Sequence, residues 1–310
     1  MQSRQRSERM RQARLKIDEQ PTWYHCYNRI AGTRYDLPFG DIEKEQFVRL
    51  LRRVSILYTV EVVAYQVMSN HFHLLVYAPA DEPDADEMCR RFKAFHGGRR
   101  TLEPDSPTCR RWQARSRDIS WFMRHLQQLF TGWYNRTRPV RRRGSLWADR
   151  FKHTLLESGL AVWACWTYIE NNPVRARMVE QVADYRFCSH GYWLQSGRHP
   201  FSGNVRRTAL PMLWDLFGLQ DLSEIRAAMG KALAGKVDRE ADSAGFTFSV
   251  QRRVRHWTQG LVIGSQLYVR ESLSRHRRVA DVLHHRMDRA ESLSGPPLYS
   301  WRRLRSVESG

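Results

Sequence analysis

The sequence predicts an α+β protein whose core is a four-stranded antiparallel sheet with helices on one face. Three observations lead to this class. The chain of 310 residues is long enough for one substantial domain and a smaller one. Short segments rich in β-branched and aromatic residues alternate with longer segments that have apolar residues at helical spacing. Their order is strand, helix, strand, strand, helix, strand, helix, which is that of a ferredoxin-like domain with one extra C-terminal helix.

Each of these seven elements has its own local pattern. Aromatic and polar residues alternate in the first strand, and the next two strands are expected to form a hairpin around the break at Ser69 and Asn70. The last helix stops before Pro173, which disfavours helix for the residue that precedes it. In chain order, the expected elements cover residues 23–29, 41–58, 60–68, 71–77, 119–136, 146–156 and 160–172.

Composition shifts divide the chain into three parts. Residues 1–20 carry six Lys and Arg and few apolar residues, which is typical of a basic arm outside the core. Residues 21–195 form the expected core domain, with a long insertion at 79–118 that contains glycine and proline breakers. Residues 196–310 are expected to form a basic, mainly helical C-terminal extension, which is either a DNA-recognition module or a helical cap on the core.

The charge balance predicts a polyanionic partner. The chain has 51 Lys and Arg against 32 Asp and Glu, a formal net charge of +19. Such an excess favours nucleic acid, and the planar fork of arginine matches phosphate groups. The turn at Arg141, Arg142 and Arg143, together with Arg150 and Lys152, is the expected DNA-binding surface. A merely solvated basic surface is the alternative.

Cysteine usage and hydropathy exclude other classes. The five cysteines are scattered and contain no C-x-x-C pair, which argues against a disulfide framework and against a zinc knuckle. No run of about 18 apolar residues exists and the first twenty residues are charged, so neither a membrane span nor a secretory signal is expected. We therefore expect a cytoplasmic protein.

Two histidines separated by one residue are the sharpest chemical signal. His71 and His73 lie on an expected strand, where side chains at i and i+2 point to the same face and Phe72 points into the core. Imidazole suits Mn²⁺, and phosphate oxygens and water can complete a shell around Mg²⁺. Taken alone, such a pair is more often structural than metal-binding.

A tyrosine and an asparagine four residues apart could complete this site. Tyr168 and Asn172 share one face of the last expected core helix. The phenol could then act as a nucleophile while the amide oxygen serves as a third metal ligand. Taken alone, Tyr168 fits an amphipathic core residue better, with its hydroxyl at the surface.

Four motifs in this order resemble those of the HUH single-tyrosine transposases. The similarity is strongest to the REP-associated tyrosine transposases, which act on repetitive extragenic palindromes, and it runs from about Trp23 to Trp193. The motifs are Tyr24-His25-Cys26-Tyr27-Asn28-Arg29, Met68-Ser69-Asn70-His71-Phe72-His73-Leu74-Leu75, Gly144-Ser145-Leu146-Trp147-Ala148-Asp149-Arg150-Phe151-Lys152 and Tyr168-Ile169-Glu170-Asn171-Asn172-Pro173-Val174-Arg175-Ala176.

The resemblance implies an enzyme that cleaves and rejoins single-stranded DNA near hairpin-forming palindromes, as a monomer or a homodimer. It assigns a divalent ion, Mg²⁺ or Mn²⁺, to His71, His73 and Asn172. It assigns the attack on the scissile phosphate to Tyr168, through a covalent 5′-phosphotyrosine intermediate. The chain departs from the family pattern in the length of the insertion at 79–118 and in the extension beyond the core.

Two other functions fit the same pattern. A ferredoxin-like sheet also supports non-catalytic modules that bind RNA or DNA, although such a module would leave the paired histidines unexplained. A metal-dependent phosphodiesterase that uses water as the nucleophile is the third possibility, with Tyr168 merely orienting the substrate.

Overall fold

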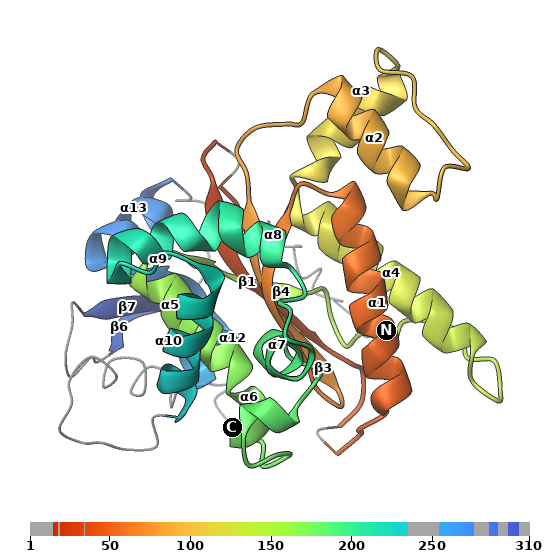
Figure 1. The fold of residues 1–310 in the computed structure, drawn as a ribbon. Coiled ribbons are helices and arrows are strands. Elements are labelled where there is room, and N and C mark those ends of the chain that lie inside the picture. Colours follow the sequence, from red (N-terminus) through yellow and green to blue (C-terminus); the bar gives the residue numbers. More distant parts are fainter. Residues whose placement is uncertain are drawn as a thin grey trace, which may run out of the picture.

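A seven-stranded mixed sheet runs through the molecule (Figure 1). The computed structural model describes residues 15–17, 19–33, 35–234, 254–275, 285–290 and 297–303. Its strands are β1 (Thr22–Arg29), β2 (Glu61–Val67), β3 (His71–Ala78), β4 (Lys152–Leu156), β5 (Gly260–Gly264), β6 (His285–Ala290) and β7 (Leu298–Arg303). The strand order is β2-β3-β1-β4-β5-β7-β6, and every neighbouring pair is antiparallel except β4 and β5.

The first four strands confirm the expected α+β class and its antiparallel core. Their order β2-β3-β1-β4 is ferredoxin-like, with α1 (Asp41–Leu57) between β1 and β2 and α4 (Ile119–Arg136) before β4. The two helices bury an apolar stripe against one face of the sheet, where Phe47, Leu51 and Phe122 are fully buried.

A second layer of helices covers the other face of the sheet, in addition to the layer that the sequence led us to expect. Its central member is α5 (Leu160–Glu170), in which every residue from Ala161 to Glu170 is buried. The helix is buried on all sides because it lies between the sheet and the C-terminal helices α9 (Leu210–Phe217), α10 (Leu222–Ala234) and α12 (Val254–Gln259).

The C-terminal extension supplies three strands as well as the expected helices. β5 adds to the free edge of β4 in parallel register, with Leu155 opposite Val262, and β7 and β6 continue the sheet. A short apolar run such as that of β5 fits either a strand or a turn of buried helix, so periodicity in the sequence could not predict that these residues form a strand. Residues 235–253 of the extension lie outside the described residues.

The insertion at 79–118 folds into two helices, α2 (Ala85–Phe95) and α3 (Pro107–Ser116), beside α1 and α4 (Figure 1). Asp84 and Ser106 cap their first turns, each accepting a hydrogen bond from a backbone amide three residues later. Met88 and Cys109 are fully buried. The segment is therefore a packed part of the main core.

The described end of the N-terminal arm also packs against the core, contrary to expectation. Leu15 and Ile17 are buried, and the ring of His153 lies 2.7 Å from the carbonyl oxygen of Leu15. Lys16 pairs with Asp118 at 2.6 Å. Residues 1–14 lie outside the described residues.

Two expected elements are shorter than predicted. The strand expected at 146–156 begins only at Lys152, because the preceding residues form turns apart from a single bridge between Trp147 and Ile30. The helix expected at 160–172 ends at Glu170, and a new short helix starts around Pro173. The remaining helices are α6 (Asn172–Arg175), α7 (Ser189–Ser196), α8 (Ser202–Asn204) and α13 (Gln266–Ser274), with a 3₁₀ turn at Val182–Asp184 and a π-helical turn at Val205–Ala209.

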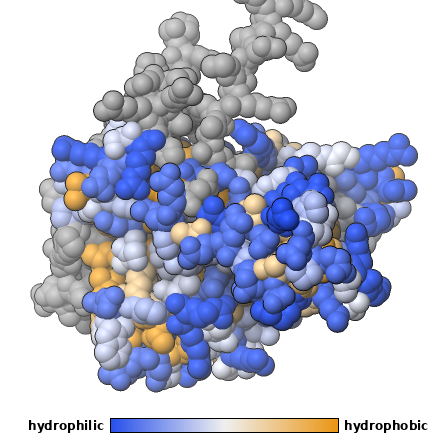
Figure 2. Space-filling model, turned by 90° about the horizontal axis from the view of Figure 1, so that it is seen from above, coloured by the Kyte–Doolittle hydropathy of each residue, from blue (hydrophilic) through white to orange (hydrophobic). Residues whose placement is uncertain are grey.

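One face of the molecule is largely polar. Hydrophilic residues cover most of the face that is seen from above in Figure 2. No helix within the described residues is long and apolar enough to cross a membrane.

A buried histidine makes stability depend on pH. His199 is 3% exposed between Trp166 and Trp193, and burial lowers its pKa to about 3. The unfolded chain, in which this pKa is near 6.5, binds a proton that the folded chain does not. The folded state therefore loses stability as the pH falls below about 6.5.

We expect His199→Asn to flatten this dependence. The asparagine keeps an acceptor near the amide of Phe201, which donates to Nδ1 of His199 at 3.1 Å, and removes the titrating ring. Between about pH 6 and about pH 4, the free energy of unfolding should fall less steeply in the variant, by up to about 1.4 kcal/mol per pH unit. Urea titrations at fixed pH measure this slope, and equal slopes in the two proteins would contradict the assignment.

Candidate active site

A row of polar side chains crosses four strands on the α5 face of the sheet. The Cα register pairs His73 with Gln66 on one side and with Tyr27 on the other. Tyr27 in turn pairs with Lys152. Directly opposed residues of antiparallel strands project to the same face, so these four side chains lie next to one another. We call Gln66, His73, Tyr27 and Lys152 the polar row.

His71 and His73 lie on β3 and share the face of the polar row. Their ring centroids are 5.2 Å apart with the ring planes at 88°. Phe72 points into the opposite core, where its ring lies 4.6 Å from that of Phe47 and 5.3 Å from that of Trp147. The alternation expected from the sequence is therefore present, and Phe72 anchors the pair of histidines.

Hydrogen bonds orient both imidazoles. Nδ1 of His71 lies 2.7 Å from Oδ1 of Asn70, and Nδ1 of His73 lies 2.9 Å from Nε2 of His25. Burial lowers the pKa of His71 to about 4, and burial also holds the pKa of His73 well below its usual value. Both rings are thus neutral at pH 7. Since an amide oxygen only accepts, His71 carries its proton on Nδ1 and leaves Nε2 available.

His25 orients the ring of His73 in a similar way. Burial lowers the pKa of His25 to about 3, and the backbone of Trp257 acts in the opposite direction. Nδ1 of His25 is buried and has no hydrogen-bond partner among the described residues. The contact between Nε2 of His25 and Nδ1 of His73 engages Nδ1 of His73, so Nε2 is the nitrogen of His73 that faces away from His25. Second partners of this kind commonly orient metal-binding histidines.

Tyr168 packs against the same histidines from α5. Its ring centroid lies 5.8 Å from that of His73 and 5.9 Å from that of His25, in edge-to-face arrangements. Trp257 of α12 stacks on its ring at 5.1 Å and 23°. The tyrosine is only 1% exposed. Sequence elements from the core domain and from the C-terminal extension therefore enclose it together.

The environment of the Tyr168 hydroxyl contains one positive charge. Burial raises the pKa of Tyr168 to about 12, while the charge of Arg175 and hydrogen bonding by Arg175 and Asn172 act in the opposite direction. The guanidinium of Arg175 lies 5.1 Å from the centroid of the Tyr168 ring. Ionisation of the phenol thus depends on positive charge at this place.

Asn172 lies in α6 and not on the helix of Tyr168. Its side chain is buried, and its amide oxygen accepts a hydrogen bond from Nη1 of Arg175 at 3.3 Å. The backbone continues from α5 through Asn171 in a helical conformation, so Tyr168 and Asn172 stay near each other. In this conformation the oxygen that was expected to bind a metal is engaged by Arg175.

Gln66 has a buried amide without a partner. Its side chain is 0% exposed, and neither its oxygen nor its nitrogen forms a hydrogen bond within the described part of the chain. A buried amide in this condition costs about 1 to 3 kcal/mol. The side chain lies beside His73 in the polar row, so an oxygen donor is present next to the histidines.

The donors fit a divalent ion with an incomplete protein shell. Among the described residues, no group of three or more His, Cys, Asp or Glu side chains is placed to hold a metal ion. The polar face does offer two neutral imidazoles with available Nε2 atoms and the amide of Gln66. Phosphate oxygens and water would fill the remaining positions around Mn²⁺ or Mg²⁺.

The expected DNA-binding residues differ in whether their side chains are exposed or engaged in hydrogen bonds within the protein. Arg141 and Arg143 are exposed, as is Arg150. Arg142 holds the turn together by donating to Oδ1 of Asn135 at 3.1 Å and to the carbonyl of Ser145 at 2.9 Å. Lys152, which is also exposed, stands at the end of the polar row beside Tyr27.

Several residues of the site had no role assigned from the sequence. His25 and Tyr27 alternate on a strand in the same way as the paired histidines, so this signal was available. Gln66 stands out as an amide among the buried residues of its strand. Trp257 has no local signal, because it meets Tyr168 only through long-range packing. The hydroxyl of Tyr27 donates to the carbonyl of Thr258, in the same segment.

The comparisons with known proteins show a distant structural similarity. No family model matches the chain, and no curated protein matches it. Among solved structures, a REP-associated tyrosine transposase bound to a REP hairpin is similar with a TM-score of 0.39 and 19% sequence identity. The match covers 60% of this chain and 86% of that chain. The function of this chain therefore has to be inferred from its own residues.

We expect Gln66→Leu to stabilise the metal-free protein. Leucine has a similar volume and removes two buried polar atoms that have no partner, so the free energy of unfolding should rise by about 1 to 3 kcal/mol. Urea unfolding in the presence of EDTA measures the change. An unchanged or lower stability would show that the amide of Gln66 is satisfied in the folded protein.

Proposed function

We propose that the protein is a DNA strand transferase of the tyrosine transposase kind. It would cleave and rejoin single-stranded DNA near hairpin-forming palindromes through a 5′-phosphotyrosine on Tyr168. The observation that carries this proposal is the approach of Tyr168 to the paired histidines, with 5.8 Å between its ring centroid and that of His73. The motifs that resemble the transposases contain these same residues, and the net charge of +19 suits a DNA substrate.

A divalent ion would be held by His71 and His73, with the amide oxygen of Gln66 as a further donor. When bound there, Mg²⁺ or Mn²⁺ would supply Lewis-acid stabilisation of the charge on the scissile phosphate. Asn172 would have to release Arg175 before it could act as the third ligand, so Gln66 is the better placed of the two amides.

Arg175 would favour the ionised form of Tyr168. A phenol whose pKa is about 12 is protonated at neutral pH and is a poor nucleophile. The guanidinium would stabilise the phenolate as the phenol proton passes to water, and the leaving 3′-oxygen would take up a proton from water. The phenolate oxygen then forms a bond to phosphorus while the bond to the 3′-oxygen breaks, which leaves a free 3′-hydroxyl. Attack by a 3′-hydroxyl on the phosphotyrosine reverses the exchange without ATP.

Substrate access requires movement near Trp257. The stacked indole leaves Tyr168 only 1% exposed, so a DNA phosphate cannot meet the hydroxyl while every side chain stays in place. Exposed Lys152 at the end of the polar row, with Arg141, Arg143 and Arg150, would contact the DNA backbone.

A second candidate function is a metal-dependent phosphodiesterase that uses water. The observation that favours it is the burial of Tyr168 together with its raised pKa, since both make the phenol a weak nucleophile. In that case a water molecule would attack the phosphate and Tyr168 would orient the substrate. No covalent protein–DNA species would form.

We expect a covalent adduct that depends on Tyr168. A labelled single-stranded DNA hairpin incubated with the protein and Mn²⁺ should give a slower band on a denaturing gel. EDTA and Tyr168→Phe should each abolish this band, because they remove the metal and the nucleophile. Tyr77→Phe is the matched control, since Tyr77 lies on β3 and packs against Trp23 away from the histidines, and it should keep the band.

The other outcomes separate the alternatives. Cleavage without an adduct that persists in Tyr168→Phe would support the phosphodiesterase. Binding of the hairpin without any cleavage in wild-type protein would support a non-catalytic module.

A further inference from the structure

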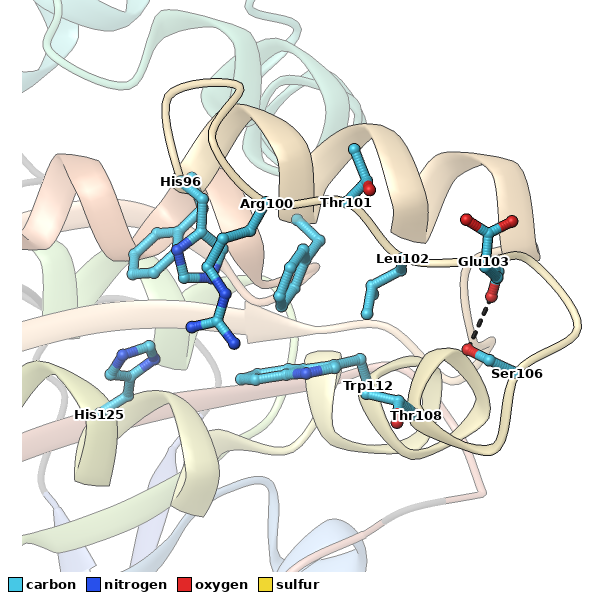
Figure 3. Close-up of a pocket in the computed structure, with 11 residues that line it drawn as sticks. His96, Arg100, Thr101, Leu102, Glu103, Ser106, Thr108, Trp112 and His125 are labelled. Carbon is cyan, nitrogen blue, oxygen red and sulfur yellow. Dashed lines mark hydrogen bonds between the residues drawn. The ribbon is translucent and has the colours of Figure 1, made fainter.

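A cavity of about 500 Å³ lies between α2, α3 and α4, within the insertion at 79–118 and beside it (Figure 3). Its aromatic residues pack with the core cluster of α1 and α4, whereas Tyr168 belongs to the cluster on the other face of the sheet. The cavity is therefore separate from the candidate active site. Its size is in the range of pockets for small organic ligands.

Aromatic rings form the inner walls of this cavity. The ring of Trp112 lies 5.9 Å from that of Phe92 and 6.4 Å from that of His125. The rings of Phe95 and His125 are 5.2 Å apart. Trp112 and His125 are only partly buried, and both line the cavity. Such walls suit a flat aromatic ligand that stacks on them.

The mouth of the cavity carries arginine. Arg100 is exposed, its guanidinium lies 5.9 Å from the centroid of Phe92, and Figure 3 shows it pointing into the space between His125 and Trp112. Arg53, which does not line the cavity, lies over the ring of the wall residue Phe95 at 4.8 Å. Burial and these arginines lower the pKa of the two lining histidines, His96 and His125, so the arginines alone supply positive charge. Glu103 is the acidic residue at the opposite end.

The surrounding segment is basic as well. Residues 90–117 contain nine Lys and Arg against two Asp and Glu. An aromatic cavity with arginine at its entrance, set in basic surroundings, matches a flat base joined to a phosphate. Single-stranded nucleic acids are bound in this manner, by stacking on aromatic side chains within a positively charged groove.

We propose that this cavity binds one unpaired nucleotide of a DNA strand. The base stacks on Trp112, and the phosphate meets Arg100. The proposal rests on the proposed function in taking DNA as the partner, but it requires neither the metal nor Tyr168. The insertion then serves as a second contact for the single-stranded part of the substrate, on the far side of the sheet from the chemistry.

The test compares two fluorescent DNA hairpins that differ only in their single-stranded arm. One arm is made of adenines and the other of abasic sites. Fluorescence anisotropy gives the Kd of each hairpin, measured in EDTA with Tyr168→Phe protein so that no strand is cut. Protein with an unaltered cavity should bind the hairpin with the adenine arm more tightly than the hairpin with the abasic arm. Trp112→Leu should lower this preference by about tenfold, the equivalent of one lost stacking contact.

Two further variants keep the result interpretable. Arg100→Gln alters an exposed side chain, so the fold is preserved, and it should weaken binding of the adenine arm. Trp121→Leu is the matched control, because Trp121 is a partly buried tryptophan of α4 that does not line the cavity, and it should keep the preference. Equal binding of both arms before substitution, or an unchanged preference in Trp112→Leu, would overturn the proposal.

The outcomes also distinguish this proposal from the proposed function. If wild-type protein forms no covalent adduct, the proposed function fails, but the preference for the adenine arm should remain. If the preference is absent, the cavity proposal fails, but the adduct should still form at saturating DNA. If free AMP at the same concentration as the hairpin removes the preference, the cavity takes free nucleotides, and its assignment to a DNA strand is overturned.

Discussion

The register between β1 and β3 is the constraint on which the candidate active site depends. It places Tyr27 opposite His73 and His25 opposite Leu75, on the face covered by α5. Since side chains alternate along a strand, a slip of one residue would turn these groups into the other core and bring Phe72 into the site. Burial of Phe72 against Phe47 and Trp147 opposes that slip, so packing on one face of the sheet fixes the chemistry on the other.

The buried part of the candidate active site consists of uncharged polar groups beside the guanidinium of Arg175. The histidines are uncharged because they are buried, and each presents a defined nitrogen because its neighbour takes up the other one. Gln66 keeps an unsatisfied amide, and Tyr168 keeps a phenol that resists ionisation. The unsatisfied amide lowers stability and the raised pKa of the phenol lowers its reactivity, and a cation bound nearby would engage the amide oxygen of Gln66 and favour the phenolate. Local features that lower the stability of the folded protein are expected at functional sites.

Local patterns in the sequence predicted the parts of this structure that depend on near neighbours. The helix at Ile119–Arg136 and the alternation around Phe72 follow directly from periodicity. Contacts between distant segments could not be predicted in this way. Packing between remote segments determines three features: the pairing of β5 with β4, the stacking of Trp257 on Tyr168 and the burial of Leu15 in the core. The engagement of Asn172 by Arg175 is a side-chain choice that spacing alone does not decide.

The position of a bound metal tests this account most directly. Crystals grown with Mn²⁺ would be measured at a wavelength where manganese scatters anomalously, which locates the ion without assumptions about its ligands. We expect one anomalous peak at bonding distance from Nε2 of His71 and Nε2 of His73, with the Gln66 amide turned toward it. A peak held by other residues, or coordination through Nδ1 of either histidine, would rule out the proposed metal site.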